Sequence, residues 1–283
     1  MTCRELYLLA RRRLGGAGVD SPGADAAALA QRFLGLDRAG LALHGEETPP
    51  PQREAAFLQA VEERAARRPL QYILGEWEFM GLPLAVGEGV LCPREDTAVL
   101  VEELARRLGE RPRPRGLDLC AGTGAVALGL RTLLPQAEVL CLELSDRAFP
   151  YLEENLRRHG KGLAAARKGD VLSPALAGEF APGSLDFIAS NPPYIETGEL
   201  PGLQPEVRRE PALALDGGAD GLVFYRAIAR LWAPLVKPGG LVAVEIGENQ
   251  GPAVERLFQQ AGLTAVETAQ DWAGLDRVVS GFR

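Results

Sequence analysis

Residues 116–130 read GLDLCAGTGAVALGL, and this stretch decides the fold of the larger part of the chain. Its first residues are mostly apolar and indicate a buried strand, and its end indicates a helix. Gly122 and Gly124 stand at the turn, where glycine permits a tight backbone and lets a ligand approach the free N–H groups of the helix. Residues 122–127 also fit the pattern GxGxxA, which is typical of dinucleotide-binding folds but recurs by chance.

Alternating strands and helices continue on both sides of this unit. The pattern predicts strands at 116–120, 139–144, 185–190, 241–246 and 264–268, with a last one near 277–282. It predicts helices at 96–109, 124–134, 146–159, 220–236 and 251–261. Such alternation indicates an α/β fold with a parallel, doubly wound sheet.

The first part of the chain has a different pattern. Residues 1–74 predict a small helical domain, with one helix near the start and others over 24–36 and 51–68, where Pro51 suits a first turn. Residues 75–92 alternate around Gly81 and predict a β-hairpin linker. We therefore expect three parts: a helical domain over 1–74, the linker over 75–92 and the α/β domain over 93–283.

Composition narrows the class of protein. The chain has 283 residues, of which 46% are hydrophobic and 24% charged, as in soluble globular proteins. No apolar run reaches the roughly 18 residues of a membrane span, and the N-terminus does not resemble a signal peptide. Four cysteines without close pairing indicate free thiols and a cytoplasmic location. The net charge of −7 argues against stable nucleic-acid binding, and two histidines argue against a metal site or a Ser-His-Asp triad.

Three carboxylates follow the predicted strands and suggest what the glycine loop binds. Asp118 lies just before the loop, and Glu143 ends the next strand and can accept the ribose hydroxyls of an adenosine. Asp170 follows a short strand and can accept the adenine amino group, with Val171 packing against the ring. Both a nicotinamide dinucleotide and S-adenosylmethionine contain adenosine. Acids beside the loop repel a pyrophosphate and attract a sulfonium, so the sequence favours S-adenosylmethionine.

A second motif, Asn191-Pro192-Pro193-Tyr194, ends the strand over 185–190. The prolines stop the strand and remove two N–H donors. The side-chain carbonyl of Asn191 and the backbone carbonyl of Pro192 can then accept both N–H groups of a planar amide or aniline-like NH2, and Tyr194 can pack against its plane. These residues predict a catalytic cradle that orients a weakly nucleophilic nitrogen.

The NPPYI stretch after a Rossmann-like glycine loop resembles amino-methyltransferases that act on adenine and on glutamine. Over nearly its whole length the chain resembles the release-factor glutamine methyltransferases (HemK/PrmC). The most specific matches are RPLQYILGEWEFMGLPLAVGEGVLCPREDT over 68–97, PEVRREPALALDGGADGLVFYR over 205–226 and DWAGLDRVV over 271–279.

The resemblance implies a seven-stranded methyltransferase domain and N5-methylation of the glutamine in the Gly-Gly-Gln loop of class 1 peptide-chain release factors. It implies S-adenosylmethionine as the donor and a helical domain that docks the release factor. By the same resemblance, Asn191 lies near the methyl group, and Asn191 through Tyr194 hold the glutamine. The residues implied to contact the cofactor are Cys120, Ala121, Gly122, Thr123, Gly124, Glu143 and Val171.

The chain departs from the family's pattern at four of these positions. The family usually has Gly at Cys120, Thr or Ser at Ala121, and Asp at Glu143, and some members carry an aromatic residue at Val171. The alternatives are an adenine-N6 methyltransferase, a glutamine methyltransferase acting on a ribosomal protein, a nicotinamide-dependent oxidoreductase and a non-catalytic binding module. The acidic charge disfavours the first, and the NPPY motif is unexplained by the oxidoreductase.

Overall fold

A computed structural model describes residues 1–109 and 111–283, which form two compact units. The first unit comprises residues 1–76 and the segment 204–209, and the second comprises residues 77–203 and 210–283. The boundary between the units falls at Glu76, inside the predicted hairpin linker. We describe each unit by itself.

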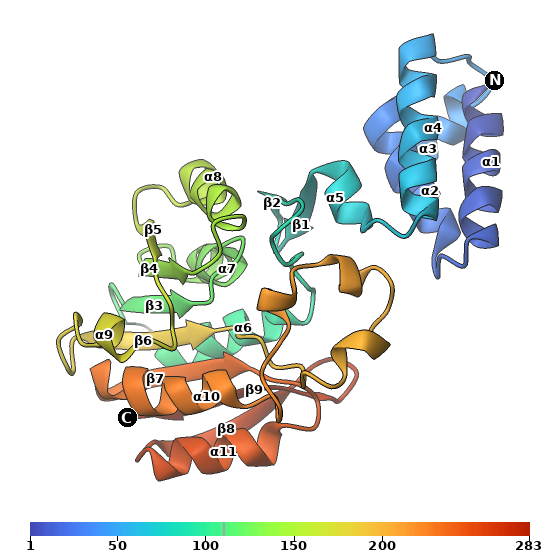
Figure 1. Ribbon diagram of the computed structural model, residues 1–283. Helices are drawn as coiled ribbons and strands as arrows, with labels where there is room; N and C mark the ends of the chain where they lie inside the picture. The colour runs from blue at the N-terminus through green and yellow to red at the C-terminus, as the bar shows by residue number, and fades with distance from the viewer. Residues whose placement is uncertain (110) are drawn as a thin grey trace. The chain divides into compact units, whose positions relative to one another are not determined.

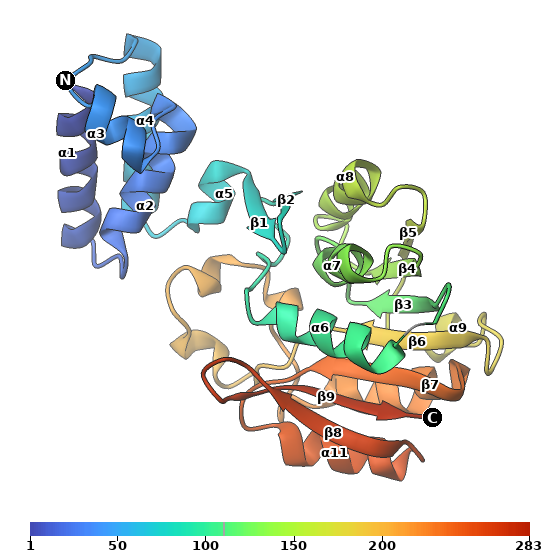
Figure 2. The same cartoon turned by 180° about the vertical axis from the view of Figure 1, so that it is seen from behind.

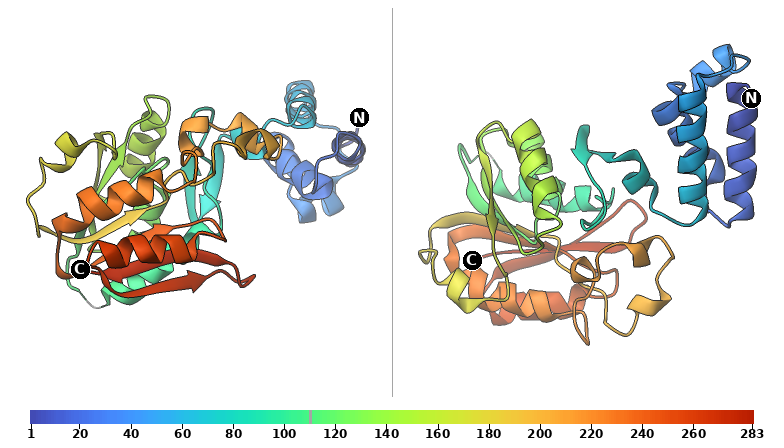
Figure 3. Two further views of the ribbon diagram at one scale, coloured as in Figure 1. Left: turned by 60° about the horizontal axis from the view of Figure 1, so that its bottom comes forward. Right: turned by 45° about the horizontal axis from the view of Figure 1, so that its top comes forward.

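The first unit is helical (Figure 1). It contains α1 (Cys3–Gly16), α2 (Pro22–Leu29), α3 (Arg38–His44), α4 (Pro51–Ala65) and α5 (Leu70–Leu74), with a π-helical turn over 30–34. Helices α1, α2 and α4 lie side by side (Figure 3). Pro51 occupies the first turn of α4, as predicted. The short helices α3 and α5 were not predicted; α3 forms because Asp37 caps it, accepting the N–H of Gly40 at 2.7 Å.

Buried ion pairs hold the segment 204–209 in this unit. Arg64 is 7% exposed, and its guanidinium lies 2.7 Å from Asp25 and 2.8 Å from Glu206. Arg67 binds the other oxygen of Glu206 at 2.7 Å. Because these partners lie far apart in sequence, no local pattern indicated that this segment belongs with the helices.

The second unit is built on a seven-stranded sheet in the order β5-β4-β3-β6-β7-β9-β8. The strands are β3 (Arg115–Leu119), β4 (Glu138–Glu143), β5 (Ala164–Lys168), β6 (Leu185–Ser190), β7 (Val236–Glu245), β8 (Thr264–Gln270) and β9 (Asp276–Phe282). Strands β3 to β7 pair in parallel, and β9 runs antiparallel to both of its neighbours. The predicted α/β class and the seven-stranded sheet are confirmed.

Helices cover both faces of the sheet, as Figures 1 and 2 show. Helices α6 (Thr97–Leu108), α7 (Ala125–Leu133) and α8 (Phe149–His159) pack on one face, around a core that includes Leu104, Leu130 and Phe187. Helices α9 (Pro174–Ala177), α10 (Val223–Ala227) and α11 (Gly251–Gln260) pack on the other, around Trp232 and Phe258. The helix predicted over 220–236 is α-helical only over α10 and continues as a π-helical turn over 228–232 and a 3-10 turn over 233–235. Pro234, which lacks an N–H, lies in the 3-10 turn.

A hairpin precedes the sheet in the chain. Strands β1 (Glu76–Phe79) and β2 (Leu82–Ala85) are joined by Met80 and Gly81, both with positive φ, as a two-residue hairpin turn requires. The buried amide of Asn155 on α8 binds both backbone groups of Ala85, at 2.7 and 3.1 Å. None of the helices formed by residues 1–109 and 111–283 combines the length and the apolarity that crossing a membrane requires.

Candidate active site

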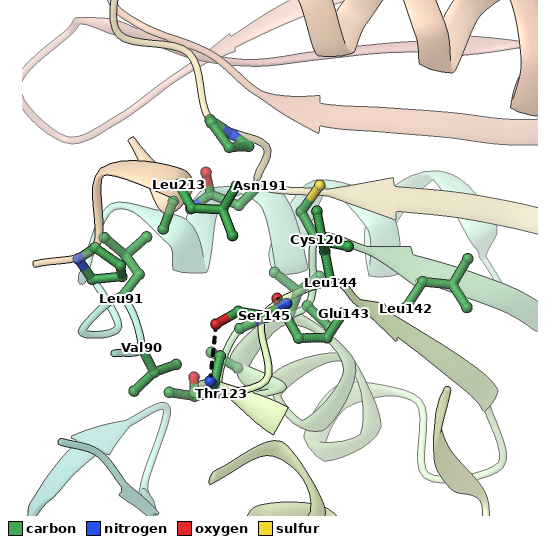
Figure 4. Close-up of a pocket in the computed structure, with 18 of the residues that line it drawn as sticks. Val90, Leu91, Cys120, Thr123, Leu142, Glu143, Leu144, Ser145, Asn191 and Leu213 are labelled. Atoms are coloured by element: carbon green, nitrogen blue, oxygen red, sulfur yellow. Dashed lines mark hydrogen bonds between the residues drawn. The ribbon is translucent and has the colours of Figure 1, made fainter. Parts of the chain in front are cut away.

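An open pocket lies at the carboxyl ends of the central strands (Figure 4). Residues at or just after the ends of β3, β4, β5 and β6 line it, including Cys120, Glu143, Asp170 and Asn191. The sheet order runs one way from β3 to β4 and the other way from β3 to β6, so the pocket lies at the topological switch point. Open α/β sheets bind their ligands at this position.

The glycine loop forms one wall through Cys120, Ala121, Gly122 and Thr123. Gly122 and Gly124 have φ of +54° and +82°, and a Cβ on Gly124 would lie 2.9 Å from Leu152. Glycine is therefore required there both for conformation and for helix packing. Cys120 has φ +60°, a conformation in which a side chain costs about 1–2 kcal/mol. The glycine that the family usually has at this position would adopt the same turn without that strain.

Glu143 supports this loop from the end of β4 and lines the pocket. One carboxylate oxygen accepts the N–H of Gly122 at 2.8 Å, and the other accepts the N–H of Ser145 at 2.7 Å. The side chain is thereby fixed, and each oxygen retains a lone pair for a further donor. This placement suits the predicted ribose contact, which stays a prediction.

Asp118 lies behind the loop and is not among the residues that line the pocket. It is 1% exposed, and its Oδ2 accepts the N–H of Ala127 on α7 at 3.1 Å, while its Oδ1 has no hydrogen-bond partner. Burial raises the pKa of this carboxyl to about 7. The charge of Glu143 also raises this pKa, whereas the hydrogen bond from the Ala127 N–H lowers it. The sequence predicted a cofactor-binding residue, whereas the structure places Asp118 behind the loop and away from the pocket surface, so its role stays a prediction.

Asp170 and Val171 both line the pocket. Asp170 is exposed and accepts the N–H of Leu172 at 2.8 Å, which turns the chain away from β5. Val171 is 3% exposed, and its carbonyl accepts the indole N–H of Trp232 at 2.8 Å. The acidic residue and the apolar residue predicted to contact the adenine are therefore held in fixed positions beside the glycine loop.

The Asn-Pro-Pro-Tyr turn follows β6 on the other side of the switch point. Asn191 and Pro193 line the pocket, whereas Pro192 and Tyr194 do not. The Asn191 Nδ2 donates to Thr97 Oγ1 at 3.1 Å. Tyr194 packs against the core around Trp232, and its hydroxyl lies 3.4 Å from Glu245. Burial and the Glu245 carboxylate raise the pKa of Tyr194.

Sequence reasoning missed the wall formed by residues 89–94 and by Thr97. The buried carboxylate of Glu210 fixes this wall, because it accepts the backbone N–H of Cys92 at 2.9 Å and pairs with Arg94. Pro93, which stands between an apolar run and charged residues, was the one local sign that the chain turns here. No local sequence pattern indicated that Glu210, 118 residues away, binds the backbone of Cys92.

The pocket thus brings together most of the predicted residues from both motifs. Cys120, Ala121, Gly122, Thr123, Glu143, Asp170, Val171, Asn191 and Pro193 line it. Asp118, Gly124, Pro192 and Tyr194 lie outside its surface. Glu143, at the end of β4, and Asn191, in the turn after β6, therefore reach one cavity from the two sides of the switch point.

Comparisons with known proteins agree with this arrangement. Residues 5–75 match the PrmC N-terminal domain model, and residues 93–203 match the methyltransferase small domain model. The chain is 42% identical to the release factor glutamine methyltransferase of Moorella thermoacetica, over 100% of this chain and 99% of that protein. It is 41% identical to that of Geobacter sulfurreducens, over 99% and 96%. A solved methyltransferase from Pyrococcus furiosus shares the fold at 16% identity, with a TM-score of 0.51 over 81% of this chain and 97% of that one.

Proposed function

The chain belongs to the release factor glutamine methyltransferase family, and we propose that it methylates N5 of the glutamine in the Gly-Gly-Gln loop of class 1 peptide-chain release factors. The observation that carries the proposal is the meeting of Glu143 and Asn191 in one pocket. An adenosine-binding carboxylate and an amide-binding turn at one switch point are what transfer from S-adenosylmethionine to an amide requires.

The hydrogen bonds of the glycine loop support S-adenosylmethionine over a dinucleotide. The N–H of Gly122 is taken by Glu143 and the N–H of Ala127 by Asp118, so these donors are not free for a pyrophosphate. The same carboxylates give this side of the pocket negative charge, which favours a cation. When bound, S-adenosylmethionine supplies a methyl group on a positively charged sulfur. Glu143, Val171 and the loop residues Cys120 to Thr123 would hold it.

The amide-binding turn prepares the nucleophile. An amide nitrogen is a weak nucleophile because its lone pair is delocalised, so the site must fix its direction and favour pyramidal geometry. Asn191 Oδ1 accepts one N–H group of the glutamine. The carbonyl oxygen of Pro192 is assigned to the other N–H, although Pro192, like Tyr194, does not line the pocket in this structure. The prolines contribute no N–H that would compete for these acceptors.

The release factor is a protein partner, and we assign its docking to the helical residues 1–74. An enzyme that modifies release factors works where translation takes place, which gives a cytoplasmic location. The net charge of −7 is consistent with a protein substrate and opposes stable binding to nucleic acid.

The test is methyl transfer from labelled S-adenosylmethionine to separate substrates. We expect label on a class 1 release factor and none on the same protein with its Gly-Gly-Gln glutamine changed to alanine, or on duplex DNA. Label on DNA would establish the adenine-N6 alternative instead. A fourth reaction contains ribosomal proteins, and label there in preference to the release factor would overturn the assigned partner.

A further inference from the structure

Three side chains from separate elements meet beside the amide-binding turn. Thr97 begins α6 and is 3% exposed, Glu245 ends β7 and is 2% exposed, and Asn191 follows β6. Strands β6 and β7 are neighbours in register, with Ser190 opposite Val244, so Asn191 and Glu245 leave the sheet side by side. Thr97 and Asn191 line the pocket, whereas Glu245 does not.

A hydrogen bond joins two of these side chains, and the third lies beside them. Asn191 Nδ2 donates to Thr97 Oγ1 at 3.1 Å. The carboxylate of Glu245 also faces the Thr97 hydroxyl, which helps to lower a pKa that burial raises to about 7. Tyr194 contributes a longer contact from the other side, with its hydroxyl 3.4 Å from Glu245 Oε1.

The chemistry of these groups fixes a direction. An ionised carboxylate only accepts hydrogen bonds, so the single hydroxyl proton of Thr97 is drawn to Glu245. The lone pairs of Thr97 Oγ1 then face Asn191 and can only accept, which selects the NH2 end of the Asn191 amide. The carbonyl end, Oδ1, points away from Thr97 and remains free to accept from a ligand.

This direction matters because an amide side chain is nearly symmetric in shape. Rotated by half a turn, Asn191 would present its NH2 group to the NH2 group of a substrate amide, and two donors cannot bond each other. Packing alone distinguishes the two orientations poorly, whereas a hydroxyl restricted to accepting distinguishes them by a whole hydrogen bond.

We propose that Thr97, anchored by Glu245, is a positioning residue for methyl transfer, which turns the Asn191 carbonyl toward the substrate amide. The inference rests on the proposed function, since it assigns a role within the same site. It extends the site to two side chains that neither the glycine loop nor the Asn-Pro-Pro-Tyr turn contains.

The first experiment compares Thr97→Val, which keeps the shape and removes the hydroxyl, with Thr97→Ser, which keeps the hydroxyl. Assays run at about pH 8.5, where a carboxyl of pKa about 7 is ionised. With a release factor as substrate, we expect Thr97→Val to lower kcat by about 10- to 100-fold through loss of orientation. Thr97→Ser should restore most of the rate. Affinity for S-adenosylmethionine, measured by calorimetry, should be the same in both variants.

Two further variants separate positioning from direct contact and from general damage. Glu245→Gln changes a group outside the pocket, and we expect it to lower kcat several-fold, whereas a direct contact by Thr97 would be insensitive to it. Thr132→Val removes a hydroxyl that donates to the carbonyl of Gly129 within α7, and it should leave kcat unchanged. Equal losses in Thr97→Val and Thr97→Ser, or no loss in Thr97→Val, would overturn the proposal.

A second readout needs neither substrate nor cofactor. The side-chain NH2 resonances of Asn191, identified by their loss in Asn191→Asp, should exchange slowly in the wild type and in Thr97→Ser, and fast in Thr97→Val. Identical exchange in all three would refute the hydrogen bond on which the inference depends. If the wild type transfers no methyl group to a release factor, the proposed function fails, and this measurement still decides the orientation of Asn191.

Discussion

Replacing Asp118 by asparagine tests the electrostatics of the site most directly. The carboxyl is 1% exposed, and only one of its oxygens has a hydrogen-bond partner, the N–H of Ala127. Asparagine has the same shape and can accept the same N–H, but it does not titrate. The substitution therefore removes a buried charge and leaves the contact with α7 in place.

The size of the effect follows from the pKa. Burial raises the pKa of Asp118 from 3.8 to about 7, so the native state binds this proton more tightly than the unfolded state does. Its contribution to stability is full below about pH 4 and is lost as the pH rises through about 7. Between pH 5 and pH 8 the wild type should lose about 2–3 kcal/mol of unfolding free energy that Asp118→Asn does not lose.

The assay is urea unfolding of both proteins, without cofactor, at several pH values between those limits. Any constant difference between Asp and Asn cancels when the two pH profiles are subtracted. The titration of Glu245, whose pKa is also raised by burial to about 7, is present in both proteins and cancels as well. Parallel profiles, within about 0.5 kcal/mol, would refute the reasoning, because they would mean that the buried carboxyl ionises without cost.

The same variant tests the predicted contribution of Asp118 to cofactor binding. If its charge attracts the donor, Asp118→Asn should weaken the binding of S-adenosylmethionine, which is cationic at sulfur, more than that of S-adenosylhomocysteine, which is neutral there. Titration calorimetry with both ligands measures the ratio. An unchanged ratio would restrict Asp118 to supporting the loop.

Three further substitutions test the pocket. Glu143→Ala should weaken cofactor binding by about 1.5–3 kcal/mol, since it removes an ionised acceptor, and unchanged affinity in calorimetry would contradict the ribose contact. Asn191→Ala should lower kcat by about 100-fold with little change in donor affinity, and the reverse pattern in steady-state and binding measurements would contradict its role. Cys120→Gly should raise the unfolding free energy by about 0.5–1 kcal/mol, because relief of the strain at φ +60° exceeds the entropy that glycine adds to the unfolded chain. A lower urea midpoint would mean that packing of the sulfur outweighs that strain.

The sequence by itself determined the parts of this protein that depend on neighbouring residues. The strand, turn and helix over 116–130 lie where the pattern predicts them, because hydrophobic period and glycine act over a few residues. Strands β3, β4, β6, β7, β8 and β9 were predicted for the same reason, with bounds that differ by at most two residues except at the start of β7, five residues before the predicted 241. Strand β5 was predicted only as a short strand before Asp170, without bounds. The Asn-Pro-Pro-Tyr turn could likewise be predicted at the end of β6, because proline ends a strand whatever surrounds it.

Only the tertiary structure decided which side chains these elements bring together. Thr97 and Asn191 meet across 94 residues, Glu210 fixes the backbone at Cys92 across 118, and Glu206 joins Arg64 in the helical unit. Asp118 illustrates the limit most clearly: its position before the loop was evident, but its burial behind the loop depends on α7 and on neighbouring strands. Periodicity reports which face of an element is buried, whereas pairing between distant polar groups is set by the packing of whole elements, which no short stretch of sequence contains.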